Sequence, residues 1–165
     1  MTIERRAKLR RTYVNLGMGE LAAAATFATV AAAVAVPRLE DRQDSAALWV
    51  ALVPLLVVLV QAGAYWLLAC TWVQKAPMPR GLVGAYRVFR IADSFLLFAG
   101  LVGVIVWWPD HLGLALATLG VWVFGAIEYV NYFVVRLSYP VRRWTRMVGQ
   151  WRIPQIIKDL NSTTQ

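Results

Sequence analysis

The chain has 165 residues, of which 59% are apolar and 16% are charged, and its mean hydropathy is +0.55. Soluble domains are usually about 45–50% apolar and about 25% charged, so this composition excludes soluble, disordered and disulfide-rich secreted proteins. The net charge of +8 would suit nucleic acid, but long stretches free of Lys and Arg confine the basic residues to short segments. That distribution is typical of a polytopic membrane protein, and we expect no nucleic-acid partner.

Four apolar runs follow one another along the chain, at residues 13–36, 47–73, 91–108 and 112–135. Each is long enough to cross about 30 Å of hydrocarbon as a helix that rises about 1.5 Å per residue. None has the polar–apolar alternation of a membrane β-barrel. Pro37 ends the first run, Pro77 and Pro79 follow the second, and Pro109 begins a tight turn after the third. We therefore predict an all-α integral membrane protein with a four-transmembrane-helix bundle over residues 13–137.

The positions of Lys and Arg predict the orientation of this bundle. Fifteen of the 17 lie in a basic tail (residues 1–12), between the second and third runs, or after residue 135. Cytoplasmic segments carry the excess of Lys and Arg, so we expect both termini in the cytoplasm and the bundle in the cell membrane. A cleaved signal peptide at the first run is the alternative, which its length and its Glu20 disfavour.

The last part of the chain, residues 140–165, has a different pattern. Val141, Trp144, Val148 and Trp151 recur at spacings of three, four and three, with arginines between them. An apolar stripe opposite a basic face indicates an interfacial amphipathic helix in the cytoplasmic headgroup region. We expect this segment to contact anionic lipid. The predicted lipid-contacting residues are Trp144, Trp151, Arg142, Arg143 and Arg146.

Three acidic residues fall inside the predicted spans, and ionisable residues there are functional candidates because they are costly to bury. Glu20, Asp93 and Glu128 lie 16, 15 and 17 residues from the outer ends of their helices, at Val36, Trp108 and His111. At about 1.5 Å per residue, these separations correspond to roughly 24, 22 and 25 Å. Three carboxylates on different helices therefore share one depth, in the cytoplasmic leaflet.

Polar neighbours on the same helix faces complete a candidate ligand site. Asn131 and Tyr132 follow Glu128 by three and four residues, which places them around one position on the helix. Carboxylate and amide oxygens suit a cation or an amine-bearing ligand. We predict the ligand-binding residues to be Glu20, Asp93, Glu128, Asn131, Tyr132, Gln61 and Tyr65.

The small residues of the fourth run share the face of Glu128. At about 100° per residue, Gly113, Ala117 and Gly120 point the same way as Glu128. Small residues let membrane helices approach closely, so we expect this whole face to turn towards the other helices.

Three functions fit these residues. The first is a transporter or a subunit of a homo-oligomeric or larger membrane complex that binds an ion or small cationic ligand at the carboxylate layer. The second is an enzyme acting on a lipid headgroup from the cytoplasmic leaflet. The third is a structural subunit in which Arg90 neutralises Asp93 and Arg136 neutralises Glu128. We expect a non-enzymatic role without a cofactor or metal centre. The single cysteine and the single histidine exclude an internal disulfide, a histidine metal site and haem held between two imidazoles.

Overall fold

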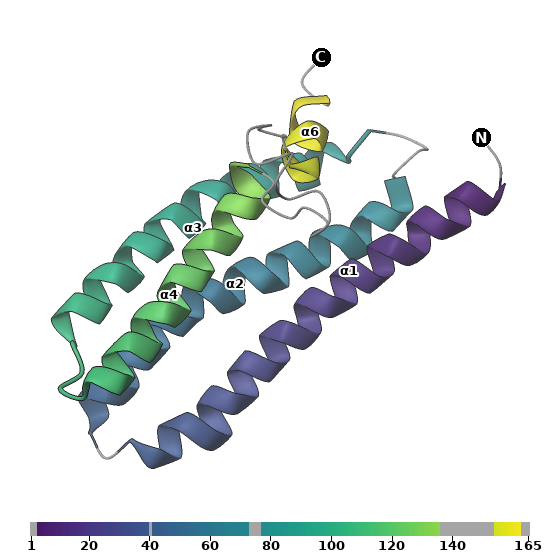
Figure 1. The fold of residues 1–165 in the computed structure, drawn as a ribbon. Helices are drawn as coiled ribbons and strands as arrows, with labels where there is room; N and C mark the ends of the chain where they lie inside the picture. The colour runs from purple at the N-terminus through teal and green to yellow at the C-terminus, as the bar shows by residue number, and fades with distance from the viewer. Residues whose placement is uncertain (1–2, 40, 73–76, 136–153, 163–165) are drawn as a thin grey trace, which may run out of the picture.

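Four long helices make up most of the computed structural model, which describes residues 3–39, 41–72, 77–135 and 154–162. Consecutive long helices run in opposite directions, and a short helix lies across one end of the bundle (Figure 1). The predicted all-helical class is confirmed, since each of the four is long and apolar enough to cross a membrane. The elements are α1 (Ile3–Val30), η1 (Ala31–Ala35), η2 (Val36–Arg38), α2 (Arg42–Trp72), α3 (Arg80–Val106), α4 (Leu112–Phe133) and α6 (Gln155–Ser162).

The helices differ in length from the apolar runs that predicted them. The first begins at Ile3 instead of residue 13, and the third begins at Arg80 instead of residue 91. Hydropathy marks the part of a helix that suits hydrocarbon, whereas Arg and Lys are good helix formers and let the helix continue beyond it. Pro79 stands immediately before α3, a position where a missing backbone N–H costs little.

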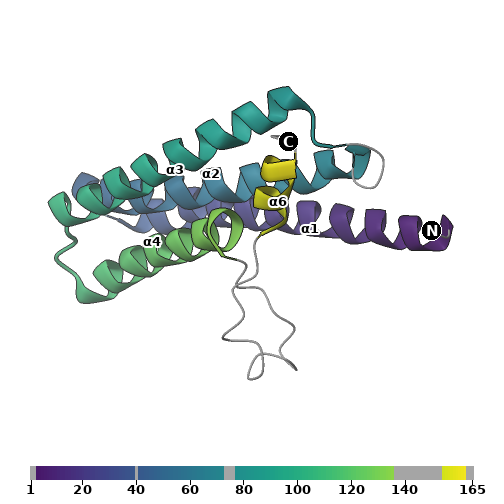
Figure 2. The same cartoon turned by 90° about the horizontal axis from the view of Figure 1, so that it is seen from above.

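The second helix, α2, lies at the centre of the bundle and contacts α1, α3 and α4 (Figures 1 and 2). In its most apolar window 56% of the residues are buried, against 28% or less in the other three helices. Glycines bring two neighbours close to it. A Cβ on Gly17 would lie 2.9 Å from the carbonyl oxygen of Gly63, and a Cβ on Gly100 would lie 2.7 Å from that of Val50. Glycine at these crossings therefore sets the distance between the helix axes.

For the half of α4 that lies towards the α3–α4 turn, the prediction that the face with the small residues turns inwards is wrong. A Cβ on Gly113 or Gly120 would meet open space, and Ala117 is exposed. Ala115 and Thr118 are buried there instead. The helical wheel grouped the small residues correctly but could not tell their direction, because the surface of a membrane helix that faces lipid is as apolar as the surface that faces protein.

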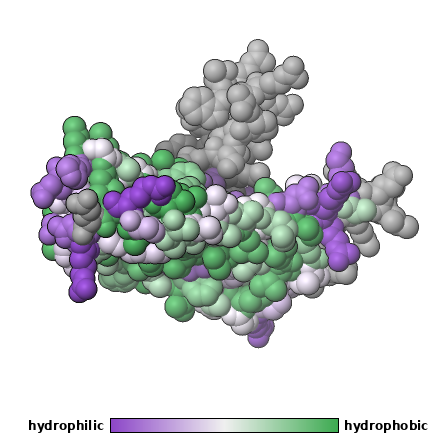
Figure 3. Space-filling model, turned by 90° about the horizontal axis from the view of Figure 1, so that it is seen from below, coloured by the Kyte–Doolittle hydropathy of each residue, from purple (hydrophilic) through white to green (hydrophobic). Residues whose placement is uncertain are grey.

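The outer surface of the bundle is strongly apolar. Large side chains such as Phe95, Phe98 and Leu112 are 67–71% exposed. In the space-filling view apolar side chains cover the middle of the molecule, and most hydrophilic ones gather at its two ends (Figure 3). Soluble monomers rarely expose apolar surface of this extent, so the arrangement is compatible with a membrane protein.

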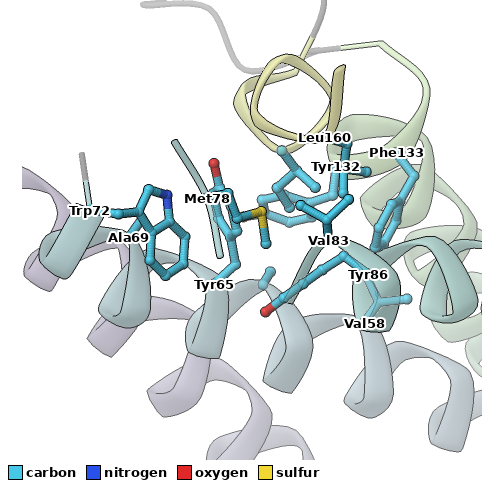
Figure 4. Packing of buried hydrophobic residues seen from close by; sticks show 12 residues of the cluster. Val58, Tyr65, Ala69, Trp72, Met78, Val83, Tyr86, Tyr132, Phe133 and Leu160 are labelled. Atoms are coloured by element: carbon cyan, nitrogen blue, oxygen red, sulfur yellow. The ribbon is translucent and has the colours of Figure 1, made fainter. Parts of the chain in front are cut away.

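The short helix α6 packs against the end of the bundle that also carries the C-terminus of α2, which we call the tail end (Figure 4). Ile156 and Leu160 are buried in an aromatic cluster beneath it. The Tyr65 hydroxyl donates to Asp159 Oδ2 at 2.7 Å, and Trp72 Nε1 donates to the same oxygen at 3.4 Å. Part of the predicted cytoplasmic segment thus folds onto the helices, while the predicted lipid-contacting residues at 142–151 lie outside the described residues.

Candidate functional site

The first element of the site is a hydrogen bond between α1 and α4. The Tyr132 hydroxyl donates to Glu20 Oε1 at 2.5 Å. Gly17, one turn before Glu20, holds this part of α1 close to α2 and so fixes the height and direction of the carboxylate. The bond also places Glu20 beside the last turns of α4. This position agrees with the depth that the sequence predicts for Glu20 and Glu128.

The second carboxylate of the site belongs to Glu128, one turn before Tyr132 on α4. Its side chain is hydrogen-bonded to Asn131 and interacts electrostatically with Glu20. Two acidic groups from different helices therefore lie within reach of each other's charge. In a medium of low dielectric constant such like charges repel strongly unless a positive charge offsets them.

A cavity of about 100 Å³ lies between α1, α2 and α4 and under the start of α6. Glu20 lines it, whereas Glu128 stands one turn before the lining residues Asn131 and Tyr132 on α4. The cavity is large enough to hold water or a small ion. The Trp66 indole forms part of the wall and lies close to the Tyr132 hydroxyl without a hydrogen bond of normal geometry; its Nε1 is buried without a partner among the described residues. The lining residues are Leu16, Glu20, Trp66, Asn131, Tyr132, Pro154, Gln155 and Ile156.

The third predicted carboxylate, Asp93, does not line this cavity. It is only 1% exposed and accepts a hydrogen bond at 3.0 Å from Gln61 Nε2, across the contact between α3 and α2. The other oxygens of the pair, Asp93 Oδ2 and Gln61 Oε1, are buried without a hydrogen-bond partner among the described residues. The sequence placed the three acids correctly on three helices but could not separate them into two locations.

The remaining predicted ligand residue, Tyr65, points to α6 and binds Asp159. Sequence reasoning missed this contact and the part that Trp66, Pro154 and Gln155 take in the cavity. A usable signal existed in the last part of the chain. Pro154 followed by Ile156 and Leu160, four residues apart, is typical of a short helix with one apolar edge.

No Lys or Arg among the described residues forms an ion pair with Glu20, Asp93 or Glu128. Arg90 is exposed, and its carbonyl oxygen accepts hydrogen bonds from the Ser94 and Tyr129 hydroxyls. The predicted pairing of Arg90 with Asp93 is therefore absent. Arg136, the predicted partner of Glu128, lies outside the described residues.

Within the same described part of the chain, no cluster of three or more His, Cys, Asp or Glu side chains is placed to hold a metal ion.

Comparison of the chain with protein-family models, with curated proteins and with solved structures finds no match. The site must therefore be interpreted from its own geometry.

Proposed function

We propose that the protein is an integral protein of the cell membrane that binds a monovalent cation in the cavity beside Glu20 and Glu128, as a transporter or as a subunit of a membrane complex. The ligand is an inorganic ion or a small primary ammonium. One observation carries the proposal: the Glu20 carboxylate lines a cavity and interacts electrostatically with Glu128 of α4, and neither acid has an ion-pair partner among the described residues. A bound monovalent cation would attract both carboxylates and reduce the repulsion between them.

The chemistry of the cavity wall supports a cation of this kind. The Glu20 carboxylate and the Asn131 side chain offer oxygens to the cavity, and the aromatic residues Trp66 and Tyr132 also line it. Oxygen ligands suit hard cations, and the faces of aromatic rings attract ammonium groups.

The proposed orientation places the tail end at the cytoplasmic face, with both termini in the cytoplasm. The excess of Lys and Arg in the segments at this end supports that orientation. The arginines at positions 142, 143 and 146 would then contact anionic lipid in the inner leaflet. The ligand would reach the cavity from the cytoplasmic half of the membrane.

Titration of the full-length protein in nanodiscs with methylammonium, Na⁺ and K⁺ tests the proposal, with the fluorescence of Trp66 as the signal. We expect saturable binding of at least one of the three. Glu20→Gln or Glu128→Gln should weaken it about tenfold or more, since loss of an interaction with a charged group costs about 1.5–3 kcal/mol. Comparison of the wild type with Trp66→Phe identifies the part of the tryptophan fluorescence change that comes from the cavity.

Asp110→Asn is the matched control, because Asp110 is an exposed carboxylate in the turn between α3 and α4, at the other end of the bundle. That variant should bind as the wild type does. Binding that is absent for all three cations, or that is unchanged in both glutamate variants, would contradict the proposal.

A further inference from the structure

The buried pair formed by Asp93 and Gln61 is separate from the cavity and has an unusual pattern of hydrogen bonds. One bond is made, from Gln61 Nε2 to Asp93 Oδ1 at 3.0 Å. Two oxygens of the same pair, Gln61 Oε1 and Asp93 Oδ2, are buried without a partner among the described residues. Buried polar atoms are satisfied in the great majority of proteins, so two such atoms on touching side chains need an explanation.

A single proton would satisfy both atoms. An ionised carboxylate only accepts hydrogen bonds, and an amide oxygen also only accepts them. Asp93 Oδ2 and Gln61 Oε1 therefore cannot hydrogen-bond to each other while Asp93 is ionised. A protonated carboxyl group carries an O–H on Oδ2, which donates to Gln61 Oε1 while Oδ1 still accepts from Gln61 Nε2. The acid and the amide then form a closed ring with two hydrogen bonds.

We infer that Asp93 and Gln61 form a proton-binding site in the interior of the bundle, distinct from the proposed cation site. The Gln61 backbone is held in place by the Tyr86 hydroxyl, which donates to its carbonyl oxygen at 2.9 Å. Asp93 is 99% buried, so the proton is shielded from solvent. The inference depends on this pair alone and does not require that a cation binds beside Glu20.

The titratable groups on the helices around the pair are engaged elsewhere or exposed. Tyr65 binds Asp159, Glu128 binds Asn131, and the Tyr129 hydroxyl bonds to Ser94 and to the carbonyl of Arg90. Arg87 and Arg90 are exposed on α3. Within the described residues, Gln61 is the hydrogen-bond partner that Asp93 has.

Infrared spectroscopy of the full-length protein in nanodiscs at neutral pH tests the inference. The spectrum should contain the C=O stretching band of a protonated carboxylic acid, which is lost in Asp93→Asn and moves to higher frequency in Gln61→Leu as its hydrogen bond is removed. Asp93→Asn should retain the thermal stability of the wild type, because the new amide can form the same ring with Gln61. Glu20→Gln, the control outside the pair, should keep the band.

Carbon-13 labelling of the aspartate carboxyl groups gives a second readout that needs no substitution. The label should shift this band in the wild-type protein, and labelled glutamate should not. A spectrum in which aspartate contributes only carboxylate bands, or a carboxylic-acid band that persists in Asp93→Asn, would overturn the inference.

Discussion

The hydrogen bond from Tyr132 to Glu20 joins α1 and α4 at the cavity. The rings of Phe27 and Phe124 also meet between these two helices, with centroids 5.8 Å apart, and α2 packs against both helices (Figure 1). The bond fixes one carboxylate oxygen and leaves the group's remaining lone pairs for other partners. At the scale of single residues, the proposed cation binding therefore depends on a tyrosine that orients an acid, with Glu128 and Asn131 close to this tyrosine in the sequence of α4.

Replacing Tyr132 by Phe removes this donor and keeps the ring. We expect cation affinity to fall about tenfold or more, because the Glu20 carboxylate loses its fixed direction and a hydrogen bond to a charged group is worth about 1.5–3 kcal/mol. Tyr129→Phe is the control, since its hydroxyl bonds to Ser94 and to the Arg90 carbonyl. The same nanodisc titration measures both, and equal effects of the two variants would argue against a specific role for Tyr132.

At the scale of helices, close contact with α2 determines where the functional side chains lie. Gly17 packs on Gly63, and Gly125 packs on Leu55, so α1 and α4 are both positioned by the same central helix. Glu20 follows Gly17 by one turn, and Glu128 follows Gly125 in the same way. Each acid therefore stands one turn beyond a glycine contact, and the geometry of the site follows from the helix crossings.

Gly17→Val should destabilise the bundle. The added side chain would meet the Gly63 carbonyl and the Leu67 side chain, and overpacking of this kind costs about 1–3 kcal/mol. Gly19→Val is matched to it, because Gly19 is on the same helix and a Cβ there meets nothing within 4 Å. Thermal unfolding in detergent measures the difference. A lower melting temperature for Gly17→Val alone supports the crossing, whereas equal melting temperatures would refute it.

At the scale of the whole molecule, the sequence predicts the number of helices and their order, because each span needs a long apolar run and each turn is marked by proline. It does not predict that Gly113 and Gly120 face outwards, since lipid and protein offer similar apolar surroundings. It also does not predict that Tyr65 binds Asp159, because that contact joins a span to a short helix 94 residues away. The three acids could be singled out from the sequence because ionisable residues are costly to bury in a membrane. Which of them lie close together depends on the tertiary structure.

The orientation of the whole molecule can be measured with single cysteines introduced into a Cys70→Ser background. Asp110→Cys lies in the α3–α4 turn, and Lys8→Cys lies in the basic start of α1. If both termini are cytoplasmic, a membrane-impermeant maleimide applied to intact cells should label position 110 and leave position 8 unlabelled until the cells are permeabilised. The reverse pattern would place the termini outside and would move the cavity to the outer leaflet.

We propose that Glu20 and Glu128 act together on one bound cation. A double-mutant cycle with Glu20→Gln, Glu128→Gln and the double variant measures this directly, using the cation affinity of the nanodisc-embedded protein. Residues that share a partner couple, whereas independent sites add within about 0.3–0.5 kcal/mol. We predict that the double variant loses clearly less binding free energy than the sum of the two single losses. Additive losses, or single variants with wild-type affinity, would contradict a shared cation site.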